Sequence, residues 1–337
     1  MYRSEIKKKI KGKNILITGG TGSFGKQILI ELLKYEPLKI IIFSRDEKKQ
    51  YDLKQIYIDH LKKLFFILGD VRDFSKLKDA TAEIDFIFHA AALKQVPSCE
   101  LDPYEAVKTN IKGTENVRRA AIECGVDTVI TISTDKAVKP VNVMGMTKAI
   151  QERIMLQRHH LELKTKFICV RYGNVLSSRG SVVPLFYNKI INNMPLPITD
   201  PNMTRFILTL SEAVQLVFYA LLNGENGELW VKKMESTTVE DLANSLSSGM
   251  TKQKTYPRKV IGTRAGEKKH EVLISEEEMS RSIEYEEYFL IKNQLTMDHS
   301  LVIQSNQKKE YSSDSVPRIS KDKLKNLLAS EGYFEES

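Results

Sequence analysis

Short apolar runs alternate with longer amphipathic stretches from Asn14 to about Tyr172, and this alternation constrains the fold more than any other feature of the chain. The runs are rich in Ile, Val and Phe without polar alternation, which is typical of strands covered on both faces: NILIT, KIIIF, LFFIL, DFIFHAA, TVITIS and KFICVRY. Helical spacing between them predicts helices over 23–35, 46–61, 103–124 and 142–161, and a weaker one over 74–82. Repeated right-handed β-α-β units predict an α/β fold with a doubly wound parallel sheet.

The alternation of strand-like and helix-like segments ends at about Tyr172. A proline-bearing stretch, NMPLPITDPNMTRF, is followed later by a charged tail from Ser275 onward. We expect a doubly wound domain over 1–173 and a smaller substrate-binding region over 174–337, partly interleaved with the first. A helix over 211–222, capped by Ser211 with Glu212 in its first turn, is expected to pack back on the first domain.

Length and composition are those of an ordinary globular protein. The 337 residues are 42% hydrophobic and 28% charged. The longest apolar runs fall well short of the ~20 residues that a membrane-spanning helix needs. The basic start, MYRSEIKKKIKGK, is not followed by an apolar signal region, and Cys99, Cys124 and Cys169 have no CxxC spacing. We therefore expect a cytoplasmic protein with reduced thiols and no membrane insertion.

The net charge of +8, from 51 basic and 43 acidic residues, favours a polyanionic partner. Charge alone does not choose among nucleic acid, an acidic surface and a phosphorylated small molecule. A nucleic-acid role ranks last, because the sequence has neither aromatic interleaving nor a recognisable nucleic-acid motif. We therefore expect a small-molecule partner and no nucleic acid.

The first predicted strand runs directly into TGGTGSFG, a strand-to-helix turn with three spaced glycines. The first glycine permits the tight turn, the second lets the backbone approach a pyrophosphate, and the third lets helix and strand pack closely. The helix N-terminus then faces the phosphate charge. This context predicts a dinucleotide site rather than a purely structural turn. The cofactor-binding residues expected here are Gly19, Thr21, Gly22, Ser23, Phe24 and Gly25.

The residues after the second predicted strand indicate which dinucleotide binds. Ser44 and Arg45 stand about where NAD-binding proteins place an acidic residue for the adenosine ribose. A hydroxyl and a guanidinium suit a 2′-phosphate, so NADP is favoured over NAD. The alternative is an exposed Arg45 that pairs with Asp46 or Glu47. Further cofactor contacts are expected from Asp70, Val71, Ala90, Ala91 and Ala92.

Several motifs occur in an order that resembles a known family: TGGTGSFG, FSRDEKK, GDVRD, HAAALKQVP, STDKAVKP, RYGNVLSSRGSVVPLF, TDPNMTRF and GEKKHE. Over residues 14–280 the chain resembles the extended short-chain dehydrogenases/reductases of the CapD-like polysaccharide-biosynthesis group. More narrowly, it resembles the inverting UDP-N-acetylglucosamine 4,6-dehydratases (5-epimerases). The resemblance implies a Rossmann fold, an NADP-dependent lyase acting on UDP-N-acetylglucosamine for capsule or other surface-glycan synthesis, and a homo-oligomer, either a dimer or a hexamer.

One position departs from this family. The family carries Tyr-xxx-Lys, in which the tyrosinate takes the proton of the sugar 4-hydroxyl, but this sequence has Met144 four residues before Lys148. A thioether has no ionisable proton, although a methionine variant occurs in the capsular branch that VMGMTKAIQER resembles. Lys148 would still bond the nicotinamide ribose. Three acceptors stay open for the first proton: Thr134 linked to Lys148, an ordered water, or the pair formed by Asp135 and Lys136.

Asp135 and Lys136 carry the chemistry that the resemblance implies. Ordinary hexose 4,6-dehydratases place Asp-Glu there, and the glutamate removes the carbon 5 proton. Lys136 can do so only as a neutral amine, so we expect burial and the positive charge of Lys94, Lys139 or Lys148 to lower its pKa. Asp135 would then hold the proton that helps the 6-hydroxyl leave. An adjacent Asp-Lys pair is by itself typical of a surface turn, but the end of a central strand favours catalysis.

The implied mechanism recycles the cofactor. Carbon 4 is oxidised by NADP⁺, the ketone acidifies carbon 5, water leaves, and the hydride returns to carbon 6 while carbon 5 is reprotonated from the opposite face. The product is UDP-2-acetamido-2,6-dideoxy-β-L-arabino-hex-4-ulose. Two alternatives stay open: a UDP-sugar 4-epimerase, whose usual tyrosine is missing here, and a catalytically inactive NADP-binding regulator.

A nucleoside diphosphate sugar presents a pyrophosphate, which arginines and backbone amides receive. By resemblance, the substrate-binding residues are Lys94, Asn174, Arg179, Ser181, Arg205, Arg264 and Glu267. Arg205 is expected at the UDP portion, and Arg264 and Glu267 at its pyrophosphate and ribose. Each arginine has an alternative role as a salt bridge between segments.

Overall fold

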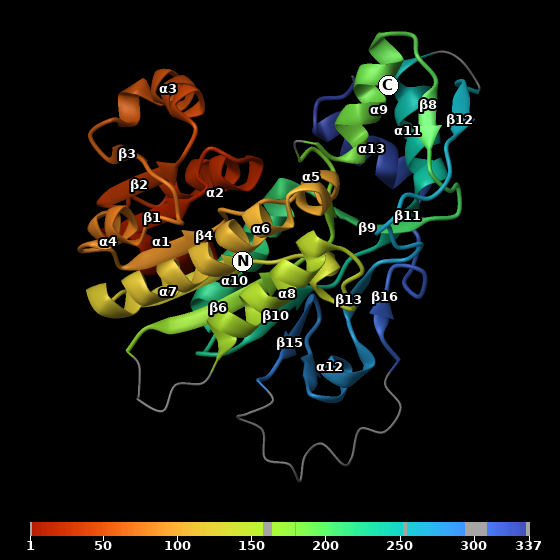
Figure 1. The fold of residues 1–337 in the computed structure, drawn as a ribbon. Helices are drawn as coiled ribbons and strands as arrows, with labels where there is room; N and C mark the ends of the chain where they lie inside the picture. The colour runs from red at the N-terminus through yellow and green to blue at the C-terminus, as the bar shows by residue number, and fades with distance from the viewer. Residues whose placement is uncertain (1, 158–163, 179, 252–254, 294–308, 335–337) are drawn as a thin grey trace.

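The computed structural model describes residues 2–157, 164–178, 180–251, 255–293 and 309–334. Its main feature is a nine-stranded sheet in the order β14-β15-β10-β6-β5-β4-β1-β2-β3 (Figure 1). The parallel strands are β1 (Asn14–Thr18), β2 (Lys39–Ser44), β3 (Leu64–Leu68), β4 (Phe86–His89), β5 (Thr128–Ile132), β6 (Lys166–Arg171) and β10 (Leu229–Lys232). The antiparallel strands β15 (Tyr288–Ile291) and β14 (Ser282–Glu284) extend the β10 edge.

The six predicted strands coincide with β1 to β6, so the predicted doubly wound parallel sheet is confirmed. The apolar side chains of the inner strands are covered on both faces, since Ile15 and Ile17 of β1 and Ile87 and Phe88 of β4 are fully buried, whereas the edge strand β3 leaves Phe65 and Leu68 exposed. Because β1 pairs with both β2 and β4, and β4 pairs with β5, the carboxyl ends of β1, β4 and β5 lie at one edge of the sheet. Ligands of open α/β sheets bind at this edge.

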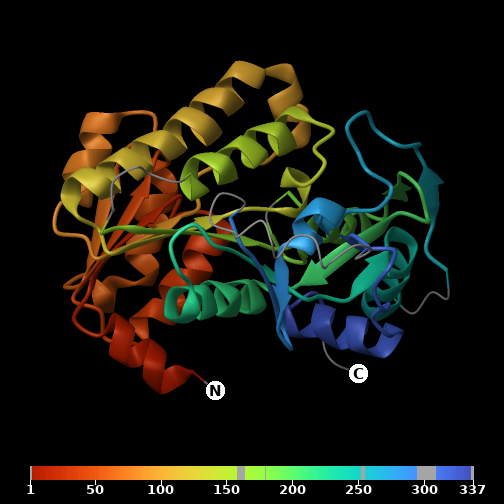
Figure 2. The same cartoon turned by 90° about the horizontal axis from the view of Figure 1, so that it is seen from below.

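Helices cover both faces of the sheet (Figure 2). One face carries α1 (Arg3–Ile10), α2 (Ser23–Leu33) and α10 (Leu210–Asn223). The other carries α4 (Phe74–Thr81), α7 (Gly113–Cys124) and α8 (Val143–Leu156). These helices bury the apolar stripes that the sequence spacing predicts, for example Ile28, Leu29 and Leu32 on α2.

Several predicted helices differ from the observed ones at their ends. The helix predicted over 46–61 is α3 (Glu47–Ile56), which is followed by a short 3₁₀ turn at Ile58–His60. The helix predicted over 103–124 is α6 (Pro103–Ala106), a π-helical turn at Val107–Lys112, and α7. The end predicted for the helix over 142–161 lies outside the described residues.

The predicted cap of the helix over 211–222 is wrong. The cap of α10 is Thr209, not Ser211. The Thr209 hydroxyl accepts a hydrogen bond from the Glu212 N–H (3.2 Å), and the Glu212 carboxylate accepts one from the Thr209 N–H (2.8 Å). This reciprocal pair satisfies two N–H groups at once, which a single bond from Ser211 could not do.

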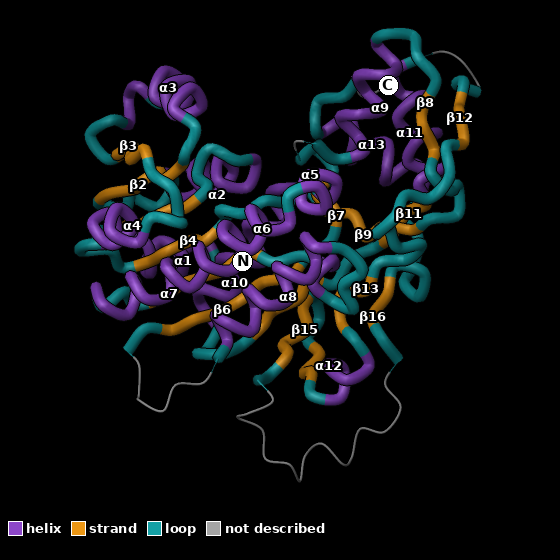
Figure 3. Tube along the Cα trace, in the orientation of Figure 1, coloured by secondary structure: helices purple, strands orange, loops and turns teal. Residues whose placement is uncertain are grey.

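The second half of the chain builds a separate apolar core beside the sheet (Figure 1). Its helices are α9 (Val182–Ile191), α11 (Val239–Met250) and α13 (Lys321–Ser330), which pack around Phe186, Leu246 and Leu328. Small sheets flank this core, one on its outer side and the others toward the main sheet (Figure 3). They contain β7 (Asn174–Val175), β8 (Leu196–Ile198), β9 (Thr204–Leu208), β11 (Ser236–Thr238), β12 (Arg258–Val260), β13 (Val272–Ile274) and β16 (Tyr311–Ser312). Among the described residues, no helix has the length and apolar character needed to span a bilayer.

Candidate active site

The glycine loop between β1 and α2 is closely packed. Gly19 has a φ of +68°, and a Cβ there would lie 2.7 Å from the Ala91 backbone N, so only glycine fits the turn. A Cβ on Gly25 would lie 2.5 Å from Gly20 Cα, so this glycine allows α2 to approach the loop. The turn and packing roles that the spacing predicts for these two glycines are confirmed.

The N-terminus of α2 fits a phosphate group. Gly22 is its N-cap, and among the described residues no side chain caps the helix and no acidic residue lies in its first turn. Apart from Gly19 O at 3.2 Å, the space that a Cβ on Gly22 would enter is open. First-turn N–H groups carry a partial positive charge that attracts anions. The loop and the N-terminus of α2 therefore have the open space and the partial positive charge that a phosphate group requires.

The end of β2 is tied to this loop and to the next strand. The hydroxyls of Thr21 and Ser44 share a hydrogen bond of 2.7 Å. Arg45 is half-exposed, and its Nη1 lies 3.4 Å from Asp70 Oδ2. Burial alone would raise the pKa of Asp70, but hydrogen bonds from Arg72 and the charges of both arginines lower it. Arg45 is thus paired across the expected adenosine site and is accessible from solvent.

The end of β4 contributes small residues and a neutral histidine. The Ala90 N–H donates to Thr18 O (3.1 Å), which holds this alanine beside the glycine loop. His89 Nδ1 lies 2.7 Å from Thr18 Oγ1, and its Nε2 lies 3.1 Å from Thr114 Oγ1. Burial lowers the pKa of His89 to about 3, so this ring is neutral at physiological pH.

One lysine and two carboxylates meet at the carboxyl end of β5, in a group that we call the Lys136 cluster (Asp135, Lys136 and Glu271). Lys136 Nζ lies 2.9 Å from Asp135 Oδ1 and 3.3 Å from Glu271 Oε1. The Thr134 hydroxyl also donates to Asp135 Oδ1 (2.9 Å). The second oxygen of each carboxylate, Asp135 Oδ2 and Glu271 Oε2, is buried and accepts no hydrogen bond from the residues that the structure describes.

The expectation that the Lys136 amine is neutral is wrong for the protein without ligands. Burial alone would lower the pKa of Lys136, but the carboxylates of Asp135 and Glu271 outweigh it and raise the pKa. The resting side chain is therefore an ammonium. The sequence could not reveal this, because Glu271 comes from a loop far along the chain.

The lysines expected to neutralise Lys136 have other roles. Lys139 pairs with Glu310, and Lys148 donates to the backbone of Ile132. Desolvation and the charge on Lys136 lower the pKa of Lys94. The repulsion between the two cations acts on both, but at Lys136 the carboxylates of Asp135 and Glu271 outweigh it.

Met144 lies in an apolar setting and Lys148 in a polar one. Met144 is buried against Cys99 and Ala106, as a core methionine would be. Lys148 Nζ donates to Ile132 O (2.6 Å) and to the Gln151 side chain, and burial lowers the pKa of Lys148 to about 8. Because Thr134 donates to Asp135 and Lys148 to Ile132, the link between Thr134 and Lys148 is not formed among these described residues.

Arg205 of β9 connects the second half of the chain to the Lys136 cluster. Its Nε lies 3.9 Å from Glu271 Oε1, and its Nη2 lies 3.3 Å from Glu267 Oε1. Its Nη1 donates to the backbone oxygens of Thr204 (2.8 Å) and Lys269 (3.1 Å). The structure therefore brings Arg205 and Glu267 together with Asp135 and Lys136.

The other predicted substrate-binding residues of the second half of the chain make no hydrogen bond or ion pair with the Lys136 cluster among the described residues. Asn174 Oδ1 is a buried acceptor that receives no hydrogen bond from the described part of the chain. The Ser181 hydroxyl donates to Leu176 O (3.2 Å) at the start of α9. Arg264 is exposed, and its backbone N lies 3.4 Å from Glu267 Oε2. Arg179 lies outside the described residues.

Sequence reasoning missed Glu271 and Lys268. Lys268 Nζ donates to Val138 O and lies 4.0 Å from Glu271 Oε2. Ser313 holds the loop on the other side, because its hydroxyl accepts a hydrogen bond from the Glu271 N–H (2.9 Å). Glu271 is the last residue of GEKKHE, which is one of the motifs that carry the family resemblance. The motif alone does not indicate that the Glu271 side chain lies beside Lys136.

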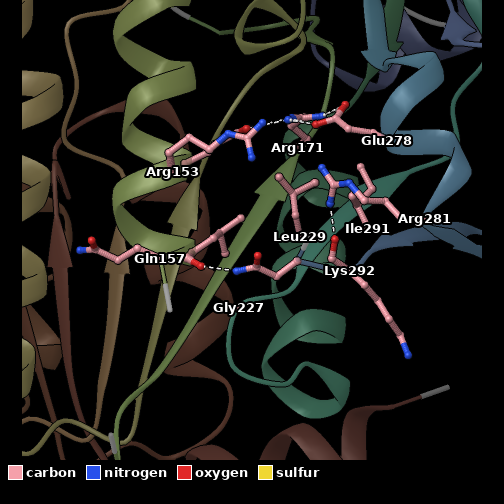
Figure 4. A pocket seen from close by; sticks show the side chains of 12 residues that line it. Arg153, Gln157, Arg171, Gly227, Leu229, Glu278, Arg281, Ile291 and Lys292 are labelled. Atoms are coloured by element: carbon pink, nitrogen blue, oxygen red, sulfur yellow. Dashed lines mark hydrogen bonds and ion pairs between the residues drawn. The ribbon is translucent and has the colours of Figure 1, made fainter. Parts of the chain in front are cut away.

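A cavity lies at the end of β6 beside a second charged group, which we call the Arg171 cluster (Glu152, Arg171 and Glu278). Arg171 donates to both oxygens of Glu152 (2.8 and 2.6 Å), to both oxygens of Glu278 (2.9 and 2.8 Å) and to Leu273 O (2.9 Å). Figure 4 shows Arg171 and Glu278 side by side at the cavity wall. Because the charges here are paired within the protein, we assign the cavity no catalytic role.

The sheet order and the glycine loop between β1 and α2 define a Rossmann-type α/β fold. The chain also matches the sequence profile described as "Polysaccharide biosynthesis protein" over residues 15–293. It belongs to this family.

Curated relatives and solved structures agree with this placement. A protein of Rickettsia bellii named "UDP-glucose 4-epimerase" is 44% identical over 336 residues, which cover 96% of this chain and 97% of the relative. The X-ray structure of Pen from Bacillus thuringiensis has a TM-score of 0.91 and 36% identity, covering 97% of this chain and 99% of that one. DesIV, a dTDP-glucose 4,6-dehydratase from Streptomyces venezuelae, has a TM-score of 0.69 at 21% identity over 75% of this chain and 86% of that one, and supports the fold alone.

Proposed function

We propose that the protein is a UDP-N-acetylglucosamine 4,6-dehydratase that inverts carbon 5 and forms UDP-2-acetamido-2,6-dideoxy-β-L-arabino-hex-4-ulose for surface-glycan synthesis. The observation that carries this proposal is the Lys136 cluster at the carboxyl end of β5. Loss of water across carbons 5 and 6 needs a group that takes a proton at carbon 5 and one that gives a proton to the 6-hydroxyl. The Lys136 cluster contains an amine and two carboxylates, and each carboxylate has one oxygen that accepts no hydrogen bond from the described residues. These groups could take and give the two protons.

NADP is the cofactor that we propose. The N-terminus of α2 would hold its pyrophosphate, and Ser44 and Arg45 its 2′-phosphate. The contact of Arg45 with Asp70 is long (3.4 Å) and half-exposed, so its loss on binding a phosphate would cost little. Lys148 would bond the nicotinamide ribose. When bound, the nicotinamide supplies reversible oxidation at carbon 4, which makes the carbon 5 hydrogen acidic. NAD is the alternative cofactor.

Substrate binding is proposed at the junction of the two halves of the chain. Arg205 would face the UDP portion from β9, and the open Asn174 Oδ1 lies on the neighbouring strand. Glu267 would accept ribose hydroxyls, and Arg264, with an exposed guanidinium, is available to the pyrophosphate. Lys94 would meet the sugar beside Lys136. Ser181 and Arg179 complete the proposed set.

A UDP-sugar 4-epimerase is the second candidate, because curated relatives carry the name UDP-glucose 4-epimerase. Epimerisation at carbon 4 needs a base for the 4-hydroxyl, and Met144 cannot take a proton. It also has no use for a proton-transfer group at carbon 5. These two points favour the dehydratase. A non-catalytic NADP-binding regulator is the remaining alternative.

The decisive experiment is incubation of the purified protein and NADP⁺ with UDP-N-acetylglucosamine in deuterated water, followed by NMR. A 4-keto-6-deoxy sugar with deuterium at an inverted carbon 5 is the expected product. UDP-N-acetylgalactosamine, or UDP-galactose from a parallel incubation with UDP-glucose, would instead identify an epimerase. Unchanged substrates together with NADP binding would identify a regulator.

The cellular setting is part of the same proposal. A UDP-sugar enzyme with NADP as cofactor is expected in the cytoplasm, where both molecules are made.

We further propose a homo-oligomer, a dimer or hexamer, because Leu101, Tyr104, Met146 and Ile150 leave large apolar side chains exposed on α5 (Val96–Leu101), α6 and α8. Light scattering after size-exclusion chromatography would measure the mass directly.

A further inference from the structure

Only one member of the Lys136 cluster can meet a substrate. The side chain of Lys136 is 24% exposed, whereas those of Asp135 and Glu271 are 1% and 3% exposed. Any contact with a sugar is therefore made by the amine, and the carboxylates act through it. The resting amine, however, is an ammonium, and an ammonium cannot accept the carbon 5 proton.

The surroundings of Lys136 identify which carboxylate can take its proton. The charged groups that face it are Asp135 on its own turn, Glu271 and Lys268 on the loop before β13, Arg205 on β9 and Lys94 on the loop after β4. Asp135 Oδ1 already accepts hydrogen bonds from both Thr134 and Lys136. Glu271 has the remaining position, with Oε1 3.3 Å from the amine, and its Oε2 accepts no hydrogen bond from the residues that the structure describes, although Lys268 Nζ lies 4.0 Å away.

We propose that Glu271 is a positioning residue that takes one proton from the Lys136 ammonium and later returns it, so that Lys136 can act on the substrate as a neutral base. The proposal rests on the dehydratase function proposed above. It assigns a role to Glu271 Oε2, because an oxygen that accepts no hydrogen bond from the described residues can carry the transferred proton. It also explains how a lysine held between two carboxylates can replace the glutamate of ordinary dehydratases.

The proton steps balance. The Lys136 ammonium transfers a proton to the Glu271 carboxylate, which leaves a neutral amine and a carboxylic acid. The amine takes the proton from carbon 5, and the C–H electron pair enters the enolate of the 4-ketone. The new ammonium gives that proton to the 6-hydroxyl, the C6–O bond breaks, the enolate electrons form the C5=C6 double bond, and water leaves. Glu271 then returns its proton to the amine.

The test is the pH profile of dehydration by Glu271→Gln. In the wild type the proton moves internally, so the rate of water loss is expected to be flat between about pH 6.5 and 9. In Glu271→Gln the ammonium must lose its proton to solvent, so the rate is expected to fall by about 10²-fold at neutral pH and to rise about tenfold per pH unit. A uniform loss at every pH would mean that Glu271 is merely structural and would overturn the proposal.

Two further variants separate proton transfer from damage to the site. Glu271→Asp keeps a carboxylate and is expected to keep the flat profile at a reduced rate. Glu310→Gln is the matched control, because Glu310 pairs with Lys139 on the same loop after β5 but is not a partner of Lys136. Its profile is expected to follow the wild type. A sloped profile in Glu310→Gln would show that any lost carboxylate gives the effect, which would also overturn the proposal.

A measurement without substrate distinguishes this proposal from the proposed function. Trace acetylation with acetic anhydride across pH, read by peptide mass spectrometry, gives the pH at which each lysine becomes a free amine. In Glu271→Gln, Lys136 is expected to react at lower pH than in the wild type, because one of its two carboxylates is gone. An unchanged Lys136 profile refutes the role of Glu271 whatever the reaction is. A shifted profile in a protein that leaves UDP-N-acetylglucosamine intact would support the pairing and refute the dehydratase.

Discussion

The Lys136 cluster and the Arg171 cluster have the same charges, one cation between two carboxylates, and lie at the ends of the adjacent strands β5 and β6. They differ in how completely their hydrogen bonds are made. Arg171 donates to all four carboxylate oxygens of Glu152 and Glu278. In the Lys136 cluster one oxygen of each carboxylate has no hydrogen-bond partner. The first arrangement is suited to holding the fold, and the second to moving protons.

The choice of cation explains this difference. A guanidinium has five N–H donors in a fixed plane and stays charged, so it can satisfy two carboxylates at once. An ammonium is a point charge that can release a proton when its surroundings favour the neutral form. β13 joins the two sites, because Arg171 donates to Leu273 within it and Glu271 lies directly before it. A rigid cluster thus anchors the strand that presents the reactive carboxylate.

Arg171→Met should have the largest effect on stability. It leaves the carboxylates of Glu152 and Glu278 buried without a cation, which costs about 3–5 kcal/mol. Urea unfolding would measure the loss. A triple variant with Met, Leu and Leu at positions 171, 152 and 278 is the matched control, since replacing a whole buried ionic group by apolar residues is often neutral. If the triple variant were no more stable than Arg171→Met, the loss would come from packing and not from unpaired charge.

Lys136→Ala should have the largest effect on activity and a smaller effect on stability than Arg171→Met. The stability effect is smaller because Arg205 and Lys268 still face Glu271 after the cation beside Asp135 is lost. We expect water loss from UDP-N-acetylglucosamine to fall by about 10³-fold, because the group that moves protons at carbons 5 and 6 is removed. The rate in deuterated water and the urea midpoint should be measured together. Retained dehydration in this variant would contradict the contrast between the clusters, as would a loss of stability as large as that of Arg171→Met.

The sequence predicts the fold better than the site, and these two clusters show why. Strands β1 to β6 are found from local composition, because each is a short run rich in Ile, Val, Leu or Phe, and all but the edge strand β3 are buried on both faces. β10 was missed, since LWVK is too short to be told from its surroundings. The position of Asp135 at the end of β5 follows from its strand. The state of Lys136 does not, because it depends on Glu271, which only the packing of the second half brings to it.

Acid should weaken the Arg171 cluster in a defined range of pH. Burial alone would raise the pKa of Glu278, but Arg171 outweighs it and lowers the pKa from 4.5 to about 2. A carboxyl whose pKa is lower in the folded state contributes stability above the unfolded value and loses it as pH falls through the folded value. The contribution is about 3 kcal/mol, lost between about pH 5 and 2. Urea midpoints of wild type and Glu278→Gln should therefore converge across this range. A constant gap would mean that Glu278 does not titrate there.

Lys136→Arg should have the smallest effect on stability and gives the sharpest comparison. Arginine keeps the positive charge between Asp135 and Glu271, and its extra donors can reach the two orphan oxygens, so we expect the free energy of unfolding to change by less than about 1 kcal/mol. Its pKa is too high for it to give up a proton, so dehydration should still be lost. The reciprocal Arg171→Lys is the control: it leaves carboxylate oxygens unsatisfied and should destabilise more than Lys136→Arg. Equal losses of stability, or activity retained by Lys136→Arg, would mean that the two clusters do not differ in function.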